Sequence, residues 1–180
     1  GRISYSANGG TGAPSSQKKA QDINLTLQGK GSLARTGYTT DGWATSSTGN
    51  KAYNFGATYS ENTSRTLYAH WNVVTYTITY NLNGGNVSTA NPTSYNVTTN
   101  TFTLNNPQKT GYTFAGWTGS NGSTKQTSVT INKGSTGNKS YTANWTANQY
   151  TITLDPQGGA GGDASKTATF GQATPTVNIP

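Results

Sequence analysis

The chain has 180 residues, of which 30% are hydrophobic, 11% are aromatic and only 9% are charged, and its formal net charge is +7. Low charge with many aromatic residues argues against disorder, and the absence of cysteine excludes disulfides, thiolate metal sites and cysteine nucleophiles. Apart from Lys18 and Lys19 the basic residues stand singly, which disfavours a nucleic-acid-binding surface. No run of 18 apolar residues occurs, so we predict no membrane span in this segment.

The predicted elements recur because the sequence repeats itself. The segment GYTTDGW at 37–43 returns as GYTFAGW at 111–117, and Trp71 and Trp145 are separated by 145 minus 71, or 74, residues. A residue found in every copy of an array usually serves the module and not a unique active site. We therefore predict three units, which are repeat 1 at residues 1–75, repeat 2 at 76–149 and the N-terminal part of a truncated third repeat at 150–180.

The first predicted element of each repeat is a strand that ends in a glycine turn. In YTITYNL at 76–82, large apolar residues alternate with polar ones, as in a strand with one buried face. Ile3 opens repeat 1 in the same way, and Ile152 opens the third repeat. Each strand runs into a Gly pair that permits the positive φ of a tight reversal, at residues 9–10, 84–85 and 158–159.

Residues 15–22 are the one segment that could hold two helical turns, since a serine there is available as N-cap, whereas Pro92 disfavours a helix in repeat 2. A second alternating piece follows, with Leu25 in repeat 1 and Phe102 in repeat 2, and we interpret it as the strand that returns beside the first.

The Gly-Tyr-x-x-x-Gly-Trp segment is predicted to form the third strand. Its second glycine, Gly116 in repeat 2, either kinks this strand or admits a neighbouring side chain. A closing strand carries Trp71 or Trp145. We thus predict a mainly β fold with four strands and at most one short helix in each module.

This order of motifs resembles the Listeria-Bacteroides repeat family, of which the B-repeat of internalin is a member. Repeat 1 departs from the pattern at Thr40 and Asp41, where repeat 2 has Phe114 and Ala115, so its core should be less apolar. The resemblance implies small β-grasp-like sheets in tandem, in a surface or secreted bacterial protein. The repeat signature consists of Tyr38, Trp43, Trp71, Tyr112, Trp117 and Trp145.

Catalytic and metal sites are disfavoured by the distribution of acidic residues. Repeat 2 contains no Asp or Glu, which excludes a glycosidase carboxylate pair and a carboxylate calcium cage there. It also disfavours an acid-assisted Lys–Asn isopeptide bond in repeat 2, while repeat 1 leaves that bond open. His70 is the only histidine, and Asn144 replaces it in repeat 2, so we expect a solvent-facing, replaceable side chain. We predict no catalytic residue, metal or cofactor.

The aromatic residues leave two interpretations open. Trp43 and Trp117 recur at one module position, which favours core packing over sugar stacking. Residues without a clear counterpart in the other copy are better candidates for a private ligand contact, and they are Tyr53, Tyr59, Tyr68 and Tyr95.

Our leading hypothesis is a non-enzymatic, extracellular spacer or stalk of a bacterial surface protein, with weak adhesion as an added role. The alternative is a carbohydrate-binding or host-receptor-binding module. The expected partners are neighbouring repeats and a cell-wall polymer, glycan or host surface protein. We also expect the truncated third repeat to pack against repeat 2 or to lend its edge to another chain. Its apolar face should comprise Tyr150, Ile152, Leu154, Phe170, Val177 and Ile179.

Overall fold

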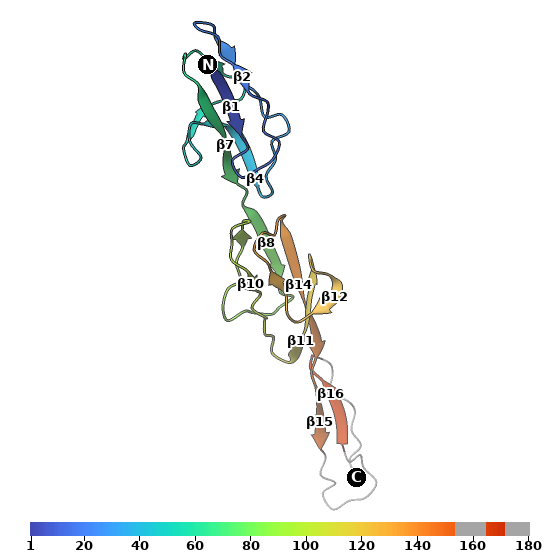
Figure 1. Ribbon diagram of the computed structural model, residues 1–180. Coiled ribbons are helices and arrows are strands. Elements are labelled where there is room, and N and C mark those ends of the chain that lie inside the picture. The colour runs from blue at the N-terminus through green and yellow to red at the C-terminus, as the bar shows by residue number, and fades with distance from the viewer. Residues whose placement is uncertain (154–164, 172–180) are drawn as a thin grey trace, which may run out of the picture. The chain divides into compact units, whose positions relative to one another are not determined.

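The computed structural model describes residues 1–153 and 165–171, and every regular element among them is a strand (Figure 1). The mainly β prediction is therefore confirmed. Residues 15–22, the segment that could have held two helical turns, instead contain strand β2 (Gln17–Lys18). It pairs antiparallel with β1 (Arg2–Ser6), with Ile3 opposite Gln17. Pairing at the sheet edge has thus overridden the local helix propensity of this polar segment.

Repeat 1 forms one five-stranded sheet and one two-stranded sheet. The larger sheet has the order β2-β1-β7-β4-β5, and β1 runs parallel to β7 while the other pairs are antiparallel. The smaller sheet pairs β3 with β6. The remaining strands of repeat 1 are β3 (Leu25–Thr26), β4 (Tyr38–Ala44), β5 (Lys51–Tyr53), β6 (Thr58–Tyr59) and β7 (Arg65–Val73).

Repeat 2 has the same strand order, β9-β8-β14-β11-β12, with the parallel pair again formed by the first and last strands of the repeat. The small sheet recurs as β10 with β13. The shared strand order agrees with our expectation of one module built twice. The strands are β8 (Tyr76–Asn81), β9 (Ser94–Tyr95), β10 (Phe102–Thr103), β11 (Tyr112–Gly119), β12 (Gly122–Gln126), β13 (Thr130–Ile131) and β14 (Lys139–Ala147).

The predicted returning strand is placed differently from our interpretation. Leu25 and Phe102 lie in strands β3 and β10, which pair with β6 and β13 and not with the opening strands. The partners of the opening strands are the two-residue strands β2 and β9. The small sheet instead buries Leu27 and Leu104 just after its first strand.

By its internal contacts the chain divides into two compact units. Unit 1 comprises Gly1–Tyr76 together with the loops Asn96–Thr99 and Lys133–Thr136. Unit 2 comprises the rest of repeat 2 and the residues that follow it. Within unit 2, β15 (Gln149–Thr153) and β16 (Ser165–Thr169) form an antiparallel hairpin.

One buried tryptophan lies at the centre of each repeat. Trp43 is fully buried, and its ring lies 4.6 Å from the Tyr5 ring between centroids. Trp117 is fully buried as well and lies 5.3 Å from the Phe114 ring. Both indoles donate a hydrogen bond, Trp43 to the Gln28 carbonyl at 2.9 Å and Trp117 to Asn106 Oδ1 at 3.0 Å. Because both rings are buried and both indole N–H groups are hydrogen-bonded, the two tryptophans fit the core-packing interpretation. Neither exposes a ring face on which a sugar could stack.

The glycine before each tryptophan produces a β-bulge. The register shifts between Phe114 and Gly116, and Gly116 has a φ of 127°. A Cβ on Gly116 would lie 2.7 Å from the backbone nitrogen of Gln126 in β12. Of the two alternatives that the sequence left open, the strand is therefore bulged, and the glycine admits neighbouring backbone and not a side chain.

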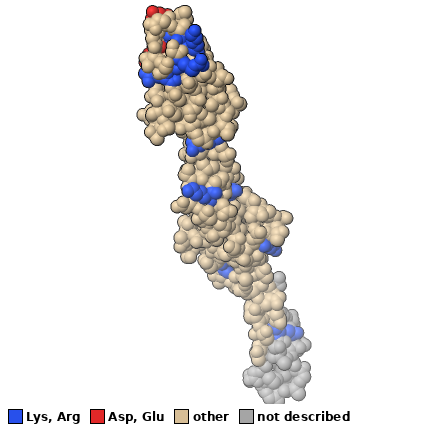
Figure 2. All heavy atoms as spheres, viewed as in Figure 1, with Lys and Arg blue, Asp and Glu red and all other residues tan. Residues whose placement is uncertain are grey.

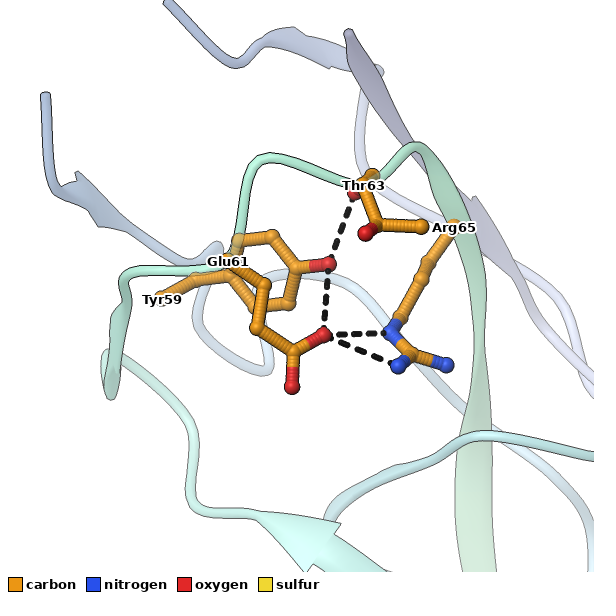
Figure 3. Close-up of polar contacts among 4 residues, drawn as sticks. All are labelled: Tyr59, Glu61, Thr63 and Arg65. Atoms are coloured by element: carbon orange, nitrogen blue, oxygen red, sulfur yellow. Dashed lines mark hydrogen bonds and ion pairs between the residues drawn. The ribbon is translucent and has the colours of Figure 1, made fainter. Parts of the chain in front are cut away.

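Two of the tyrosines without counterparts belong to the core. The Tyr59 hydroxyl donates to the Thr63 carbonyl at 2.7 Å and lies 3.3 Å from Glu61 Oε2 (Figure 3). Glu61 in turn accepts two hydrogen bonds from Arg65, which lower the pKa of its carboxyl group. Tyr95 is equally buried and donates to the Gly137 carbonyl. Both rings are buried in the core, which argues against a ligand contact at these two residues.

The hairpin of the third repeat packs less completely than we expected. Phe170 contacts the Tyr112 ring of repeat 2, with centroids 5.5 Å apart, and Ala168 is buried. Tyr150 and Phe170 nevertheless remain 52% and 40% exposed, so they do not belong to a closed apolar face. Ile152 is half-buried, and the remaining expected members, Leu154, Val177 and Ile179, lie outside the described residues.

Candidate functional site

The surface feature with the most recognisable chemistry is a cation–aromatic cluster at the glycine turn of repeat 1. The Arg35 guanidinium carbon lies 3.8 Å from the centroid of the Tyr38 ring and 6.0 Å from that of Trp71. A backbone hydrogen bond from Tyr38 N to Arg35 O closes a turn that brings the two side chains together. All three side chains are half-buried, so part of each ring and of the cation is open to solvent.

Repeat 2 rebuilds the cluster with lysine in place of arginine. Lys109 Nζ lies 4.1 Å from the Tyr112 ring centroid and 6.0 Å from that of Trp145. The same turn is closed by the hydrogen bond from Tyr112 N to Lys109 O. Lys109 Nζ also donates to the Asn83 carbonyl at 3.0 Å. The recurrence indicates that the cluster is first of all a structural part of the module.

The glycine pair of repeat 1, Gly9 and Gly10, lies directly against the cation and the indole ring of this cluster. Trp71 donates from Nε1 to the Ala7 carbonyl at 2.9 Å, just before the turn. A Cβ on Gly9 would lie 3.1 Å from the Arg35 guanidinium carbon, and one on Gly10 would lie 2.5 Å from the Trp71 ring. The pair therefore serves both the reversal and the close approach of the cation and the indole.

Repeat 1 differs from repeat 2 in the hydrogen-bonding state of its cation. Within the described residues, no acceptor receives a hydrogen bond from the Arg35 guanidinium group, whereas Lys109 is bonded. Three adjoining grooves, of about 320, 200 and 400 Å³, are each lined in part by Arg35. Tyr38 and Trp71 line the first two. A guanidinium group with unbonded donors beside aromatic rings has the geometry to bind a carboxylate or phosphate group.

The repeat signature divides between core and surface. Trp43 and Trp117 are core residues, while the other four members are half-buried and lie in the two clusters. Sequence reasoning missed the cations. Arg35 and Lys109 are 109 minus 35, or 74, residues apart, so the repeat period itself would have found them.

His70 is less free than we expected. Its Nδ1 lies 2.7 Å from Asp41 Oδ1 across β7 and β4. Partial desolvation opposes ionisation of Asp41, but the hydrogen bonds from His70 and Asn72 outweigh it and lower the pKa of the Asp41 carboxyl group. Asn144 takes the place of His70 in repeat 2 and donates to the Gly116 carbonyl at 3.0 Å. His70 and Asn144 therefore each form a polar contact with a residue of the β-bulge in their own repeat, which fits a structural role that either residue type can fill.

The Lys–Asn arrangement left open in repeat 1 is present in part. Lys19 is 1% exposed, and its Nζ donates to the Ala20 carbonyl at 2.7 Å and to Asn62 Oδ1 at 3.2 Å. Asn62 also donates to Asp22 Oδ1 at 2.9 Å. Asn62 and Asp22 are exposed, so these three residues do not form an enclosed site of the kind that an isopeptide condensation needs. The contacts satisfy the ammonium group of a buried lysine.

Charge is sparse on the rest of the surface. Figure 2 shows basic and acidic atoms gathered in the N-terminal part of the face in view, and basic side chains standing singly among uncharged residues over the rest of that face. Across residues 1–153 and 165–171, no group of three or more His, Asp or Glu side chains could hold a metal ion. In the same residues, no helix has the length and apolar character needed to cross a membrane.

Comparison with known proteins agrees with the repeat pattern. The sequence model of the Listeria-Bacteroides repeat domain matches residues 2–70 and 76–146. A protein of Evansella cellulosilytica, described as a Gly-rich membrane protein, is 29% identical over 150 residues. That alignment covers 82% of this chain and 17% of the relative, so the chain spans only a small part of its relative's length. No solved structure matches the chain.

Proposed function

Since the chain belongs to the Listeria-Bacteroides repeat family, we propose that it is a non-enzymatic spacer segment of a bacterial surface protein. The observation that carries the proposal is that the features shared by both repeats are used for folding. In both copies the central tryptophan is fully buried, the glycine before it has a positive φ at a bulge, and the glycine turn lies against the closing tryptophan. A module repeated without a shared set of catalytic groups suits an array that sets distance.

The membrane-protein description of the relative supports a place at the cell surface. So does the exterior of the repeats, which is rich in Thr, Ser and Asn and carries little charge. Such a surface stays hydrated without offering the broad apolar patches that mark obligate interfaces.

Surface display tests the spacer function. The chain would be inserted between an anchored domain and an epitope, on bacteria that carry a thick polysaccharide layer. We expect more antibody binding than with a Gly-Ser linker of equal residue number, which behaves as a flexible coil. The matched control is the double variant Trp43→Ala, Trp117→Ala, which keeps the length and removes both cores. Equal antibody binding to all three proteins would contradict the proposal.

Weak adhesion is a second candidate function, favoured by the free donors of Arg35. We propose that this cluster of repeat 1 contacts an acidic glycan or a phosphate-bearing wall polymer. Binding of polyglycerol phosphate should weaken by about tenfold in Arg35→Gln, the loss of one charge-assisted contact. Arg2→Gln removes an equal charge outside the cluster and should bind as the unaltered chain does. Equal binding by all three proteins would refute adhesion at Arg35 and leave the spacer function intact.

A further inference from the structure

The first glycine of the Gly-Tyr segment in repeat 2 lies beneath a side chain from the hairpin that follows. Gly111 has a φ of 81°, and a Cβ built on it would overlap the Phe170 ring. Phe170 also packs edge-on against Tyr112, at an interplanar angle of 77°. The contact is therefore possible only because residue 111 has no side chain.

Two backbone hydrogen bonds hold this contact in place. Phe170 N donates to the Asn148 carbonyl at 2.8 Å, and Asn148 N donates to the Gly111 carbonyl at 2.9 Å. Asn148 thus connects the glycine to the residue that covers it. Every participant lies in unit 2.

Unit 1 contains a similar contact between a glycine and an apolar side chain. Gly37 has a φ of 80°, and a Cβ on it would overlap Val97, which belongs to a loop of this unit. Val74 N donates to the Gly37 carbonyl at 2.9 Å, as Asn148 does to Gly111. Val97 O accepts a hydrogen bond from Gly134 N at 3.0 Å, which joins the two loops of unit 1.

The covering residues occupy equivalent positions. Ile152 pairs with Lys166, and Phe170 lies four residues beyond Lys166. Ile78 donates to the Thr93 carbonyl, and Val97 lies four residues beyond Thr93. In repeat 1, Ile3 pairs with Gln17, which places Gln21 at the same position. Gln21 is polar and exposed, so an apolar side chain stands at this position in repeat 2 and in the third repeat but not in repeat 1.

We propose that Gly37 and Gly111 are docking positions for one apolar side chain of the next repeat, and that this contact transmits stability from each repeat to its successor. In linear arrays, stability is the sum of each repeat's own stability and the terms between neighbours. A two-stranded hairpin such as β15–β16 is marginal alone, so it depends most on its neighbour. This coupling goes beyond the spacer function and does not require it.

Hydrogen exchange of the whole chain tests the proposal. In Phe170→Ala, we expect amides of β15 and β16 to exchange at least about tenfold faster, while those of β14 change by less than about twofold. Tyr150→Ala is the matched control, because it removes an exposed aromatic ring from the same hairpin. Gly111→Ala should act like Phe170→Ala. Gly122→Ala, also at positive φ but facing open space, should leave the hairpin unaffected.

The deciding comparison is between the two hairpin variants. Faster exchange in Phe170→Ala with no change in Tyr150→Ala would support the docking contact. Unchanged exchange in Phe170→Ala, equal acceleration in both variants, or an unprotected hairpin in the unaltered chain would overturn it. Because Phe170 lies outside the core of repeat 2, this comparison holds even if Gly111→Ala disturbs the folding of that repeat.

Discussion

A Cβ added to Gly10 would lie 2.5 Å from Cζ2 of Trp71, which is closer than two carbon atoms can approach. The second residue of the glycine turn therefore touches the ring that closes the repeat, 61 residues later by subtraction of their numbers. The same pair occurs in repeat 2 as Gly85 and Trp145. The turn and the closing strand are one packing unit.

This contact predicts that Gly10→Ala destabilises repeat 1 by about 1 to 3 kcal/mol, since the added methyl group overpacks a close contact. The measurement is the urea midpoint followed by tryptophan fluorescence. Gly29→Ala is the control, because a Cβ there meets nothing within 4 Å and the backbone is not strained. Equal midpoints for the two variants would contradict the packing role.

Truncation of the central tryptophan should be far more damaging. Trp117→Ala removes a fully buried ring and leaves Asn106 Oδ1 without its donor. We expect a loss of about 3 to 5 kcal/mol, close to the whole stability of a module of this size. Two-dimensional NMR spectra should show that repeat 2 loses its dispersed signals. A loss below about 1 kcal/mol would mean that Trp117 does not organise the core.

The Asp41–His70 pair predicts that the stability of repeat 1 depends on pH in the acid range. The folded-state pKa of Asp41 is lowered. Its contribution to the free energy of unfolding is therefore complete above the unfolded-state pKa of about 3.9, and it is lost as the pH falls through the folded-state pKa. Asp41→Asn should therefore be slightly less stable than the unaltered chain at pH 6 and equally stable near pH 2. Both side chains are partly exposed, which keeps the difference small. A difference that persists unchanged at pH 2 would contradict this assignment.

Tyr80 predicts that the stability of repeat 2 falls as the pH rises in the alkaline range. Burial, and then the neighbouring Tyr141, raise the pKa of Tyr80 to about 12. A raised folded-state pKa means that the stabilisation is complete below the unfolded value of about 10 and is lost as the pH rises toward 12. Tyr80→Phe should therefore lose less stability between pH 9 and 12 than the unaltered chain, measured by urea unfolding. An equal loss of stability in Tyr80→Phe and in the unaltered chain over this range would contradict the assignment.

Much of the fold could be predicted because its main strands are long enough to show a period of two residues. The opening strand, the Gly-Tyr segment and the closing strand all have five or more residues with one buried face. Strands β2 and β9 have two residues each, which is too short for any period. Residues 15–22 were polar and compatible with a helix, and only pairing with β1 decides their conformation.

The candidate site was harder to predict. The aromatic residues recur by identity, whereas the cation recurs as Arg35 in one copy and Lys109 in the other. Lys19 is buried in repeat 1, and Tyr95 is buried at the corresponding position of repeat 2. Neither residue type is usually fully buried, so the sequence gives no sign that this position lies in the interior. Such positions depend on contacts between distant segments, which a local pattern does not contain.

The most direct test of the spacer function is the height of a label above an anchored surface. The chain would be fixed at one end and labelled at the other, and the label's distance from a metal film would be measured by fluorescence lifetime. A second protein would carry one additional copy of residues 76–149. The spacer function predicts that the label rises with the added copy and returns toward the surface when both core tryptophans are replaced by alanine. A height that does not change with repeat number would contradict it.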